Sequence, residues 1–190
     1  MAKSNFRKES LQGKTKRTGE IAKRLKKKFP DAKIALTFSN NWELLVAVIL
    51  SAQCTDKKVN EVTRELFKKY KTLDEYVRAD TPEFEHAIKQ TGFYHAKAKS
   101  ILTTAKIIQE KFDGKIPKTM DEMLTLRGVA RKTANVVLGN AHGVIEGIAV
   151  DTHVRRLSRR LGFSTHNDPV KIEKDLMELI PKKDWFKITY

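Results

Sequence analysis

Cysteine is nearly absent from this chain of 190 residues, which contains Cys54 and no other. A disulfide within the chain is therefore impossible, and so is a metal site built from several cysteines. Long hydrophobic runs are also missing: the longest, residues 44–50, is far shorter than the roughly 20 residues of a membrane-spanning helix. The polar and basic stretch 1–17 lacks the apolar segment of a secretory signal. We expect no membrane association, a reducing cytoplasmic location, and a solvated basic arm at 1–17 that touches DNA non-specifically.

Acidic residues are outnumbered, with 23 Asp and Glu against 38 Lys and Arg, which gives a net charge of +15. Such an excess indicates a polyanionic partner, with nucleic acid ahead of an anionic membrane surface, although the chain could simply be basic. The composition is otherwise that of a globular protein, with 40% hydrophobic and 32% charged residues. The length allows one large domain or two small ones.

The alternation typical of strands and any internal repeat are lacking, while apolar residues recur at helical spacing almost everywhere. The segment 39–53 is apolar on all sides and predicts a central buried helix, with Ser39 or Asn40 as its cap. Thr81 followed by Pro82 indicates another helix start. The sequence predicts an all-α protein with some ten short helices, at about 19–30, 39–53, 56–70, 81–92, 95–112, 120–126, 132–143, 151–162 and 168–181, before a final apolar stretch.

The segment LRGVARKTANVV, residues 126–137, places a turn of small residues between two predicted helices. Gly128 and Ala130 would let backbone N–H groups approach an oxyanion, and the second helix adds its positive N-terminal end. Such a helix–hairpin–helix holds a phosphate without reading sequence. On pattern alone, an ordinary corner between helices is an equally good interpretation.

Lys132 and Asp151 are the candidate catalytic residues. A nucleophilic lysine must be neutral at some moment, and apolar neighbours, a helix N-terminus and the adjacent Arg131 would all lower the pKa of Lys132. Alternatively, Lys132 is a solvated or phosphate-contacting lysine. Asp151 follows the apolar residues 148–150 and is expected to cap a helix in any case. A carboxylate held there stays ionised, so it could stabilise a cationic sugar or orient an attacking amine.

Three separated segments carry a resemblance to a known family: LLVAVILSAQCTD at 44–56, IKQTGFYHAKAKSI at 88–101, and LRGVARKTANVVLG followed by IAVDTH at 126–153. In this order they resemble the helix–hairpin–helix DNA glycosylases, specifically the endonuclease III branch, from about residue 21 to the last. Arg127 stands where the family has proline, and Ala130 where it has glycine. Since alanine does not adopt a positive φ at low cost, we expect the turn to differ slightly.

The resemblance implies two helical domains with a DNA-binding cleft between them. One is a six-helix barrel with the helix–hairpin–helix motif, here 32–145; the other is discontinuous, here 1–31 and 146–190. The implied activity is that of a bifunctional DNA N-glycosylase and abasic-site lyase, which flips an oxidised pyrimidine out of duplex DNA and then cuts the backbone by β-elimination. Lys132 matches the lysine that forms the Schiff base with the sugar, and Asp151 matches the carboxylate that assists it.

The resemblance also implies a set of DNA-binding residues. Gln53 and Phe93 match the positions that fill the gap left by the flipped base. The alternatives are a buried amide capping a helix for Gln53 and a core aromatic for Phe93. Cys54, beside them, is expected to be a small buried hydrophobe. The remaining implied contacts are Gly128, Val129, Ala130 and Arg131 in the hairpin, and Thr152 and His153, of which His153 could equally be structural.

The main departure from the family concerns its cofactor. Most endonuclease III relatives hold a [4Fe–4S] cluster with four cysteines near the C-terminus, and none of the four is present here. We therefore expect no cofactor, and a chain that is either a fragment or a shortened form. In a fragment, the second domain would be incompletely packed and the affinity for DNA reduced.

Several functions remain open beside the oxidised-pyrimidine activity. A related enzyme could act on a mismatched base or a pyrimidine dimer, a non-catalytic fragment could bind DNA through the hairpin alone, and an RNA-binding role is a remote third. The expected partner is duplex DNA with a damaged base or an abasic site, bound by a monomer.

Overall fold

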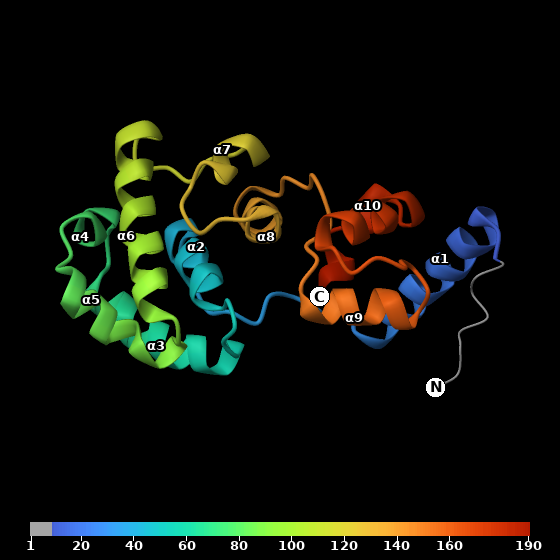
Figure 1. The fold of residues 1–190 in the computed structure, drawn as a ribbon, viewed down its shortest axis with the longest axis horizontal. Helices are drawn as coiled ribbons and strands as arrows, with labels where there is room; N and C mark the ends of the chain where they lie inside the picture. Colours follow the sequence, from blue (N-terminus) through green and yellow to red (C-terminus); the bar gives the residue numbers. More distant parts are fainter. Residues whose placement is uncertain (1–8) are drawn as a thin grey trace. The chain divides into compact units, whose positions relative to one another are not determined.

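The computed structural model describes residues 9–190, and within that range the protein is all-helical, as predicted (Figure 1). Short 3₁₀ helices η2 (Lys89–Thr91), η3 (Lys182–Asp184) and η4 (Lys187–Thr189) accompany the α-helices. No helix in the described range is long and apolar enough to cross a membrane. The α-helices are α1 (Leu11–Lys28), α2 (Asn41–Leu50), α3 (Asp56–Lys69), α4 (Leu73–Val77), α5 (Thr81–Ile88), α6 (Tyr94–Lys111), α7 (Met120–Leu124), α8 (Arg131–His142), α9 (Thr152–Arg160) and α10 (Pro169–Leu179).

The chain divides into two units. Unit 1 combines Met1–Ile34 with Ile145–Tyr190, and unit 2 is Ala35–Val144. The sequence placed the corresponding boundaries at 32 and 145. Unit 2 therefore holds α2 to α8, including the two five-residue helices α4 and α7, and unit 1 holds α1, α9 and α10.

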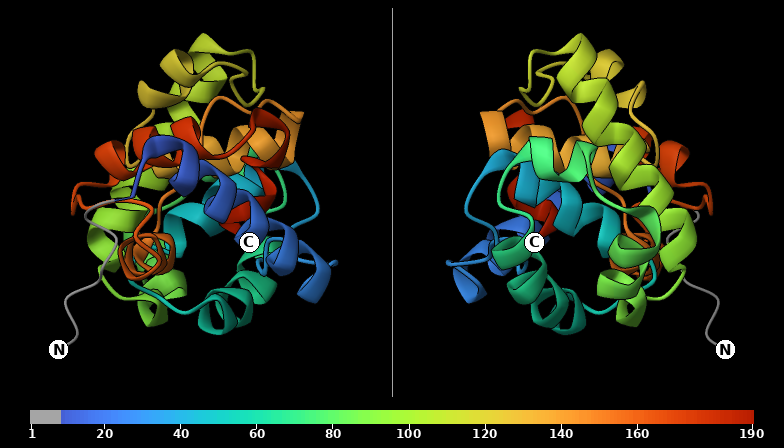
Figure 2. Two further views of the ribbon diagram at one scale, coloured as in Figure 1. Left: turned by 90° about the vertical axis from the view of Figure 1, so that its right-hand side faces the viewer. Right: turned by 90° about the vertical axis from the view of Figure 1, so that its left-hand side faces the viewer.

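Helix α2 forms the centre of unit 2. Asn40 begins it as the N-cap, because its side-chain oxygen accepts a hydrogen bond from the backbone N–H of Glu43 at 2.9 Å. Every residue from Trp42 to Leu50 is buried, which is the burial expected for a helix that is apolar on all sides. The helix packs against α3, α6 and α8, and Figures 1 and 2 show it enclosed among them.

The two long helices around α2 bury the stripes that the sequence predicted. Helix α3 buries Val59, Val62, Leu66 and, just past its end, Tyr70. Helix α6 buries its predicted face from Ile101 to Ile108, while Phe112 at the C-cap is half-buried. Spacing of three and four residues is sufficient to place such side chains on one face.

One local prediction in unit 2 was wrong, and one short helix was missed. Asp80, and not Thr81, caps α5, because its carboxylate accepts from the N–H of Glu83 at 3.0 Å. The sequence pattern also gave no sign of α4, whose five residues are too few to show a period. A capping box between Thr72 and Glu75 starts α4.

Unit 1 is built on a small apolar cluster between α9, α10 and the segment that precedes α9. Ile21 of α1 packs against it. Helix α10 starts as predicted, with Asp168 as its cap and Pro169 at its first position. The buried members of the cluster are Ile148, Val150, Phe163, Ile172, Leu176, Leu179 and Ile180.

Over 9–17 most side chains are exposed, as predicted for the solvated arm at 1–17, but the segment belongs to helix α1 from Leu11 onward. Residues 1–8 lie outside the described range. Ser10 caps α1 by accepting from the N–H of Gly13, so the helix already begins at Leu11. Arg17 is half-buried, pairs with Glu9 at 2.8 Å and donates to the carbonyl of Leu161 at 2.6 Å. This arginine ties α1 to the residues that follow α9.

Candidate active site

The hairpin between α7 and α8 rests on one face of α6. Gly128 has a φ of +76°, and a Cβ added there would lie 2.8 Å from both Cβ and Oγ of Ser100. One turn further along α6, the hydroxyl of Thr104 donates to the carbonyl of Arg127 at 3.0 Å. Glycine is required at 128 both for its left-handed backbone and for the close approach to α6.

The substitution of alanine at position 130 is accommodated without strain. Ala130 is the N-cap of α8 with a φ of −96°, which any residue adopts, so no glycine is needed there. Alanine has no side-chain oxygen, and it makes no capping hydrogen bond to the first turn of α8. The side chain of Val129 is buried, so only its backbone can face a ligand. The N-terminal end of α8 thus has the backbone geometry and dipole that suit a phosphate.

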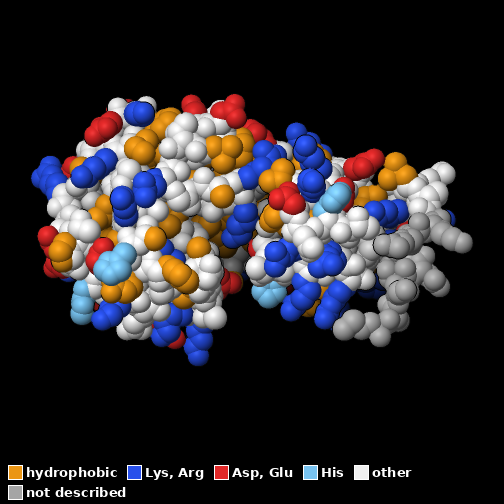
Figure 3. All heavy atoms as spheres, viewed as in Figure 1, with side chains coloured by type: hydrophobic (Ala, Val, Ile, Leu, Met, Phe, Trp, Pro, Cys, Tyr) orange, Lys and Arg blue, Asp and Glu red, His pale blue; other side chains and the backbone are white. Residues whose placement is uncertain are grey.

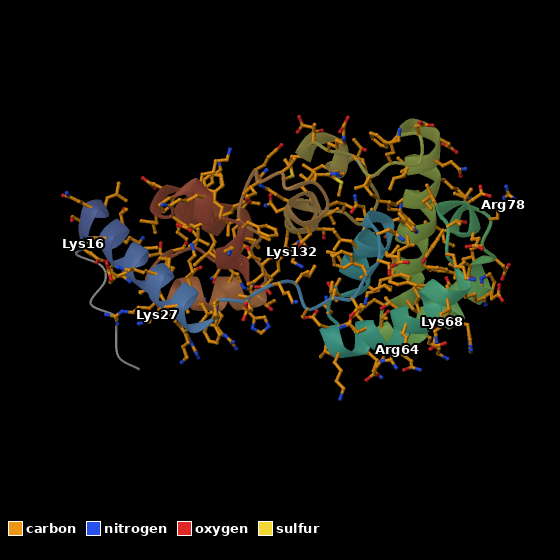
Figure 4. All side chains as sticks on the ribbon, turned by 180° about the vertical axis from the view of Figure 1, so that it is seen from behind. Lys16, Lys27, Arg64, Lys68, Arg78 and Lys132 are labelled. Atoms are coloured by element: carbon orange, nitrogen blue, oxygen red, sulfur yellow. The ribbon has the colours of Figure 1, made fainter. Side chains whose placement is uncertain are left out.

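Lys132 is the second residue of α8, and Figure 4 labels it at the start of that helix. Its side chain is half-buried, as is that of Arg131. The next turn, Ala134–Leu138, is fully buried in unit 2. The lysine therefore lies where the hairpin ends, two residues before the buried stretch of α8.

Two exposed side chains occupy strained positions in unit 2. Gln53 has a φ of +52° and Phe93 a φ of +48°, and the only other non-glycine residue with positive φ in the described chain is Asp113. Both side chains are exposed, Phe93 by 66%. The alternatives of a buried amide and a core aromatic were therefore wrong. Strain of this kind is concentrated at functional sites, which favours the interpretation that these side chains contact a ligand.

Asp151 lies in unit 1, where it caps α9. Its Oδ1 accepts from the N–H of Val154 at 2.7 Å, and the residue is half-buried behind the buried segment 148–150. The cap predicted from the sequence is confirmed. Thr152 and His153 are exposed in the first turn of α9, and the His153 ring lies 3.4 Å from the guanidinium of Arg156.

Sequence reasoning missed a basic face on α9. The helix carries four exposed arginines, and Figure 3 shows Lys and Arg side chains gathered over this part of unit 1. The spacing i, i+1, i+4, i+5 in VRRLSRR places them on one side of a helix and could have revealed them. These residues are Arg155, Arg156, Arg159 and Arg160.

In the described part of the chain, the side chains that could hold a metal ion are scattered. Within residues 9–190, no three His, Cys, Asp or Glu side chains are grouped to hold an ion. Cys54 is half-buried, not fully buried as predicted. A [4Fe–4S] cluster needs four cysteine thiolates, so the residues present do not fit one.

Comparisons with known proteins agree with this fold and these motifs. Residues 46–182 match the HhH-GPD superfamily of base excision DNA repair proteins. Endonuclease III from Synechocystis sp. is 50% identical over 175 residues, which cover 92% of this chain and 80% of that protein. Two solved structures are similar to the chain, a non-covalent endonuclease III–DNA complex and a trapped endonuclease III–DNA covalent intermediate. Each has a TM-score of 0.88 and 44% identity over 92% of this chain and 82% of the other.

The chain therefore belongs to the HhH-GPD superfamily of base excision DNA repair proteins. Within that superfamily its relatives are endonucleases III, and it is an enzyme of their type, a DNA glycosylase and abasic-site lyase. The family interpretation of the three sequence segments is confirmed.

Proposed function

We propose that this enzyme removes oxidised pyrimidines from duplex DNA and cuts the backbone at the resulting abasic site, with Lys132 as its nucleophile. The observation that carries the proposal is the position of Lys132, the second residue of a buried helix directly after the glycine hairpin. A hairpin that holds a phosphate would bring the adjacent sugar to this lysine. The trapped covalent intermediate of a 44% identical endonuclease III supports a covalent mechanism.

In this proposal the Lys132 amine attacks the sugar C1′. The bond from Nζ to C1′ forms as the glycosidic bond breaks, and the base departs with the bonding pair. The nitrogen passes one proton to the departing base, and its lone pair then breaks the bond from C1′ to the ring oxygen O4′. Water protonates O4′, which leaves a protonated imine between Lys132 and C1′. Loss of a proton from C2′ expels the 3′ phosphate by β-elimination, and water releases the lysine. The Asp151 carboxylate, held at the start of α9, stabilises the positive charge that develops on the sugar and the amine.

Gln53 and Phe93 serve a different step, the extrusion of the base. A flipped base leaves a gap in the stack, and an exposed side chain that is already held in place can fill it. Both residues are exposed, and their backbone is fixed in an uncommon conformation. A damaged pyrimidine pairs poorly, so its extrusion costs less than that of an intact base.

We further propose that the enzyme acts as a monomer in the cytoplasm, on nucleoid DNA.

The test is borohydride trapping on a duplex with one abasic site, in the presence of a chelator. We expect a covalent adduct with the wild type, none with Lys132→Gln, and a normal adduct with Lys106→Gln, which removes an exposed lysine of α6. The chelator should have no effect, because imine chemistry needs no metal. An adduct that survives Lys132→Gln would place the nucleophile elsewhere.

The substrate class is tested separately with duplexes that carry an oxidised pyrimidine, a mismatch or a pyrimidine dimer. The proposal requires excision of the oxidised pyrimidine at the highest rate. Faster excision of either other lesion would contradict the proposed substrate but would leave the proposed lyase chemistry intact.

A further inference from the structure

Lys97 is a buried lysine that the catalytic proposal does not use. It belongs to the first turns of α6, and only 5% of its surface is exposed. Its ammonium donates to the carbonyl of Leu50 at 2.8 Å and to the carbonyl of Thr91 at 2.7 Å. Burial lowers the pKa of Lys97, as expected for a charge removed from water. A lysine in such a place needs acceptors, and here both acceptors are backbone carbonyls.

The two carbonyls belong to the two loops that carry the gap-filling side chains. Leu50 is the last residue of α2, and the chain then turns toward Gln53. Thr91 is the last residue of η2, and Phe93 follows after Gly92. The backbone N–H of Lys97 also donates to the carbonyl of Phe93 at 3.1 Å. One residue therefore holds two loops that lie far apart in the sequence.

The backbone conformations at these loops need such a tether. Left-handed backbone at Gln53 and Phe93 is unfavourable for residues with a Cβ, so it persists only where the surroundings fix it. Neither side chain can supply the tether, because both are exposed. The hydrogen bonds of Lys97 end three residues before Gln53 and two residues before Phe93, which is close enough to fix the direction of each loop.

We propose that Lys97 is a positioning residue, which ties the loops of Gln53 and Phe93 together so that both side chains enter the DNA stack as one unit. The inference rests on the proposed function, because it assigns a role to a residue behind the gap-filling pair. A lysine that merely stabilised the fold would affect all steps of the reaction alike. A positioning lysine affects base excision, and it does so only while Gln53 and Phe93 are present.

The experiment is a double-mutant cycle on single-turnover base excision from an oxidised-pyrimidine duplex. Lys97→Met is compared with Lys106→Met, which removes one exposed charge from the same helix. We expect Lys97→Met to slow excision at least tenfold in the wild-type background and at most twofold when Gln53→Ala and Phe93→Ala are already present. Lys106→Met should change neither rate more than twofold. If Lys97→Met slows excision by the same factor with and without Gln53 and Phe93, the effects are independent and the proposal is overturned.

A readout that requires no activity separates this inference from the proposed function. Hydrogen exchange of the free protein should accelerate at 50–54 and 91–94 in Lys97→Met, with exchange at 101–108 unchanged. Unchanged exchange in both loops would overturn the positioning role, whatever the enzyme excises. The wild type could excise no lesion while hydrogen exchange in the two loops still depends on Lys97. That result would contradict the proposed substrate and would support the role of Lys97.

Lys97→Arg covers the case in which the methionine variant does not fold. Its guanidinium can donate to both carbonyls, so we expect excision within threefold of wild type and loop exchange close to normal. A folded arginine variant that excises as slowly as Gln53→Ala with Phe93→Ala, while its loops exchange normally, would contradict the proposal.

Discussion

The two units of the molecule differ in net charge and in how closely their backbone is constrained. Over its sequence, unit 1 has 21 Lys or Arg and 10 Asp or Glu, a net charge of +11, whereas unit 2 has 17 and 13, a net charge of +4. Unit 2 instead contains α2, which is buried from Trp42 to Leu50, together with the glycine hairpin and the two strained loops. The segments whose backbone must be placed accurately therefore lie in unit 2. Most of the electrostatic attraction for a polyanion comes from unit 1.

Unit 1, the more highly charged unit, is also packed less tightly than unit 2. Of the seven large apolar side chains that are exposed within residues 9–190, five lie in unit 1, among them Phe29 and Leu157, and two lie in unit 2, Phe93 and Leu124. Within unit 1, α1, α9 and the C-terminal residues line a pocket of about 530 Å³ that is open to solvent and largely apolar. Charge acts over several ångströms and tolerates loose placement, whereas a reacting amine or a wedge does not. The predictions below test that division, from the largest expected effect to the smallest.

Gly128→Ala should have the largest effect, because it displaces the backbone of the hairpin. Left-handed backbone costs a residue with a Cβ about 1–2 kcal/mol, and an added carbon in a packed site costs about 1–3 kcal/mol. We expect the free energy of unfolding to fall by about 2–5 kcal/mol, measured by urea denaturation. Affinity for abasic DNA should fall as well, because the hairpin moves away from α6.

Ser100→Gly is the partner variant for that prediction. It removes both atoms that lie 2.8 Å from the added Cβ, and so relieves the clash without relieving the backbone strain. Gly128→Ala should therefore cost less in the Ser100→Gly background, by about 1 kcal/mol or more. Equal costs in both backgrounds would show that the contact with α6 is unimportant.

How much of this could be predicted from the sequence depends on how local each feature is. The burial of α2 and the cap Asp151 follow from residues within one turn, and they were predicted. For the cap of α2 the sequence offered Ser39 or Asn40, and the structure selects Asn40, which accepts from the N–H of Glu43. Asp80 was missed in favour of Thr81 because both residues can cap, and the choice depends on which oxygen reaches Glu83. Lys97 could not be assigned at all, since its acceptor Leu50 lies 47 residues away and only the packing of α2 on α6 joins them.

Asp151→Asn tests whether unit 1 contributes charge or only a helix cap. Asparagine caps helices about as well as aspartate, so stability should change by less than about 0.5 kcal/mol. Loss of the negative charge should nevertheless slow base excision roughly 10- to 100-fold in single-turnover assays, with DNA affinity nearly unchanged. Asp151→Ala, which also loses the bond to Val154, should additionally lower stability by about 1 kcal/mol. An unchanged excision rate in Asp151→Asn would reduce the residue to a cap.

Phe93→Gly should move stability and activity in opposite directions. Glycine relieves the left-handed strain, so the free energy of unfolding should rise by about 1 kcal/mol. Base excision should slow about tenfold, because stacking of an aromatic side chain on a base contributes about 1–3 kcal/mol. The matched control is Asp113→Gly, at the third strained position, which should stabilise the protein without affecting excision. A slow Asp113→Gly enzyme would mean that strain itself, and not the phenylalanine ring, matters for excision.

The smallest effect is expected on the basic face of α9, where each charge is one of many. Replacement of Arg155 and Arg159 by glutamine should weaken DNA binding a few-fold at moderate salt. The slope of log affinity against log salt should fall by about 1 for each phosphate that the protein no longer neutralises, with the excision rate at saturating enzyme unchanged. The matched pair is Arg64 and Lys68, exposed on α3 of unit 2 and labelled in Figure 4. If the α3 pair lowered the slope as much as the α9 pair, the attraction for DNA would be spread evenly over both units, and their division into geometry and charge would fail.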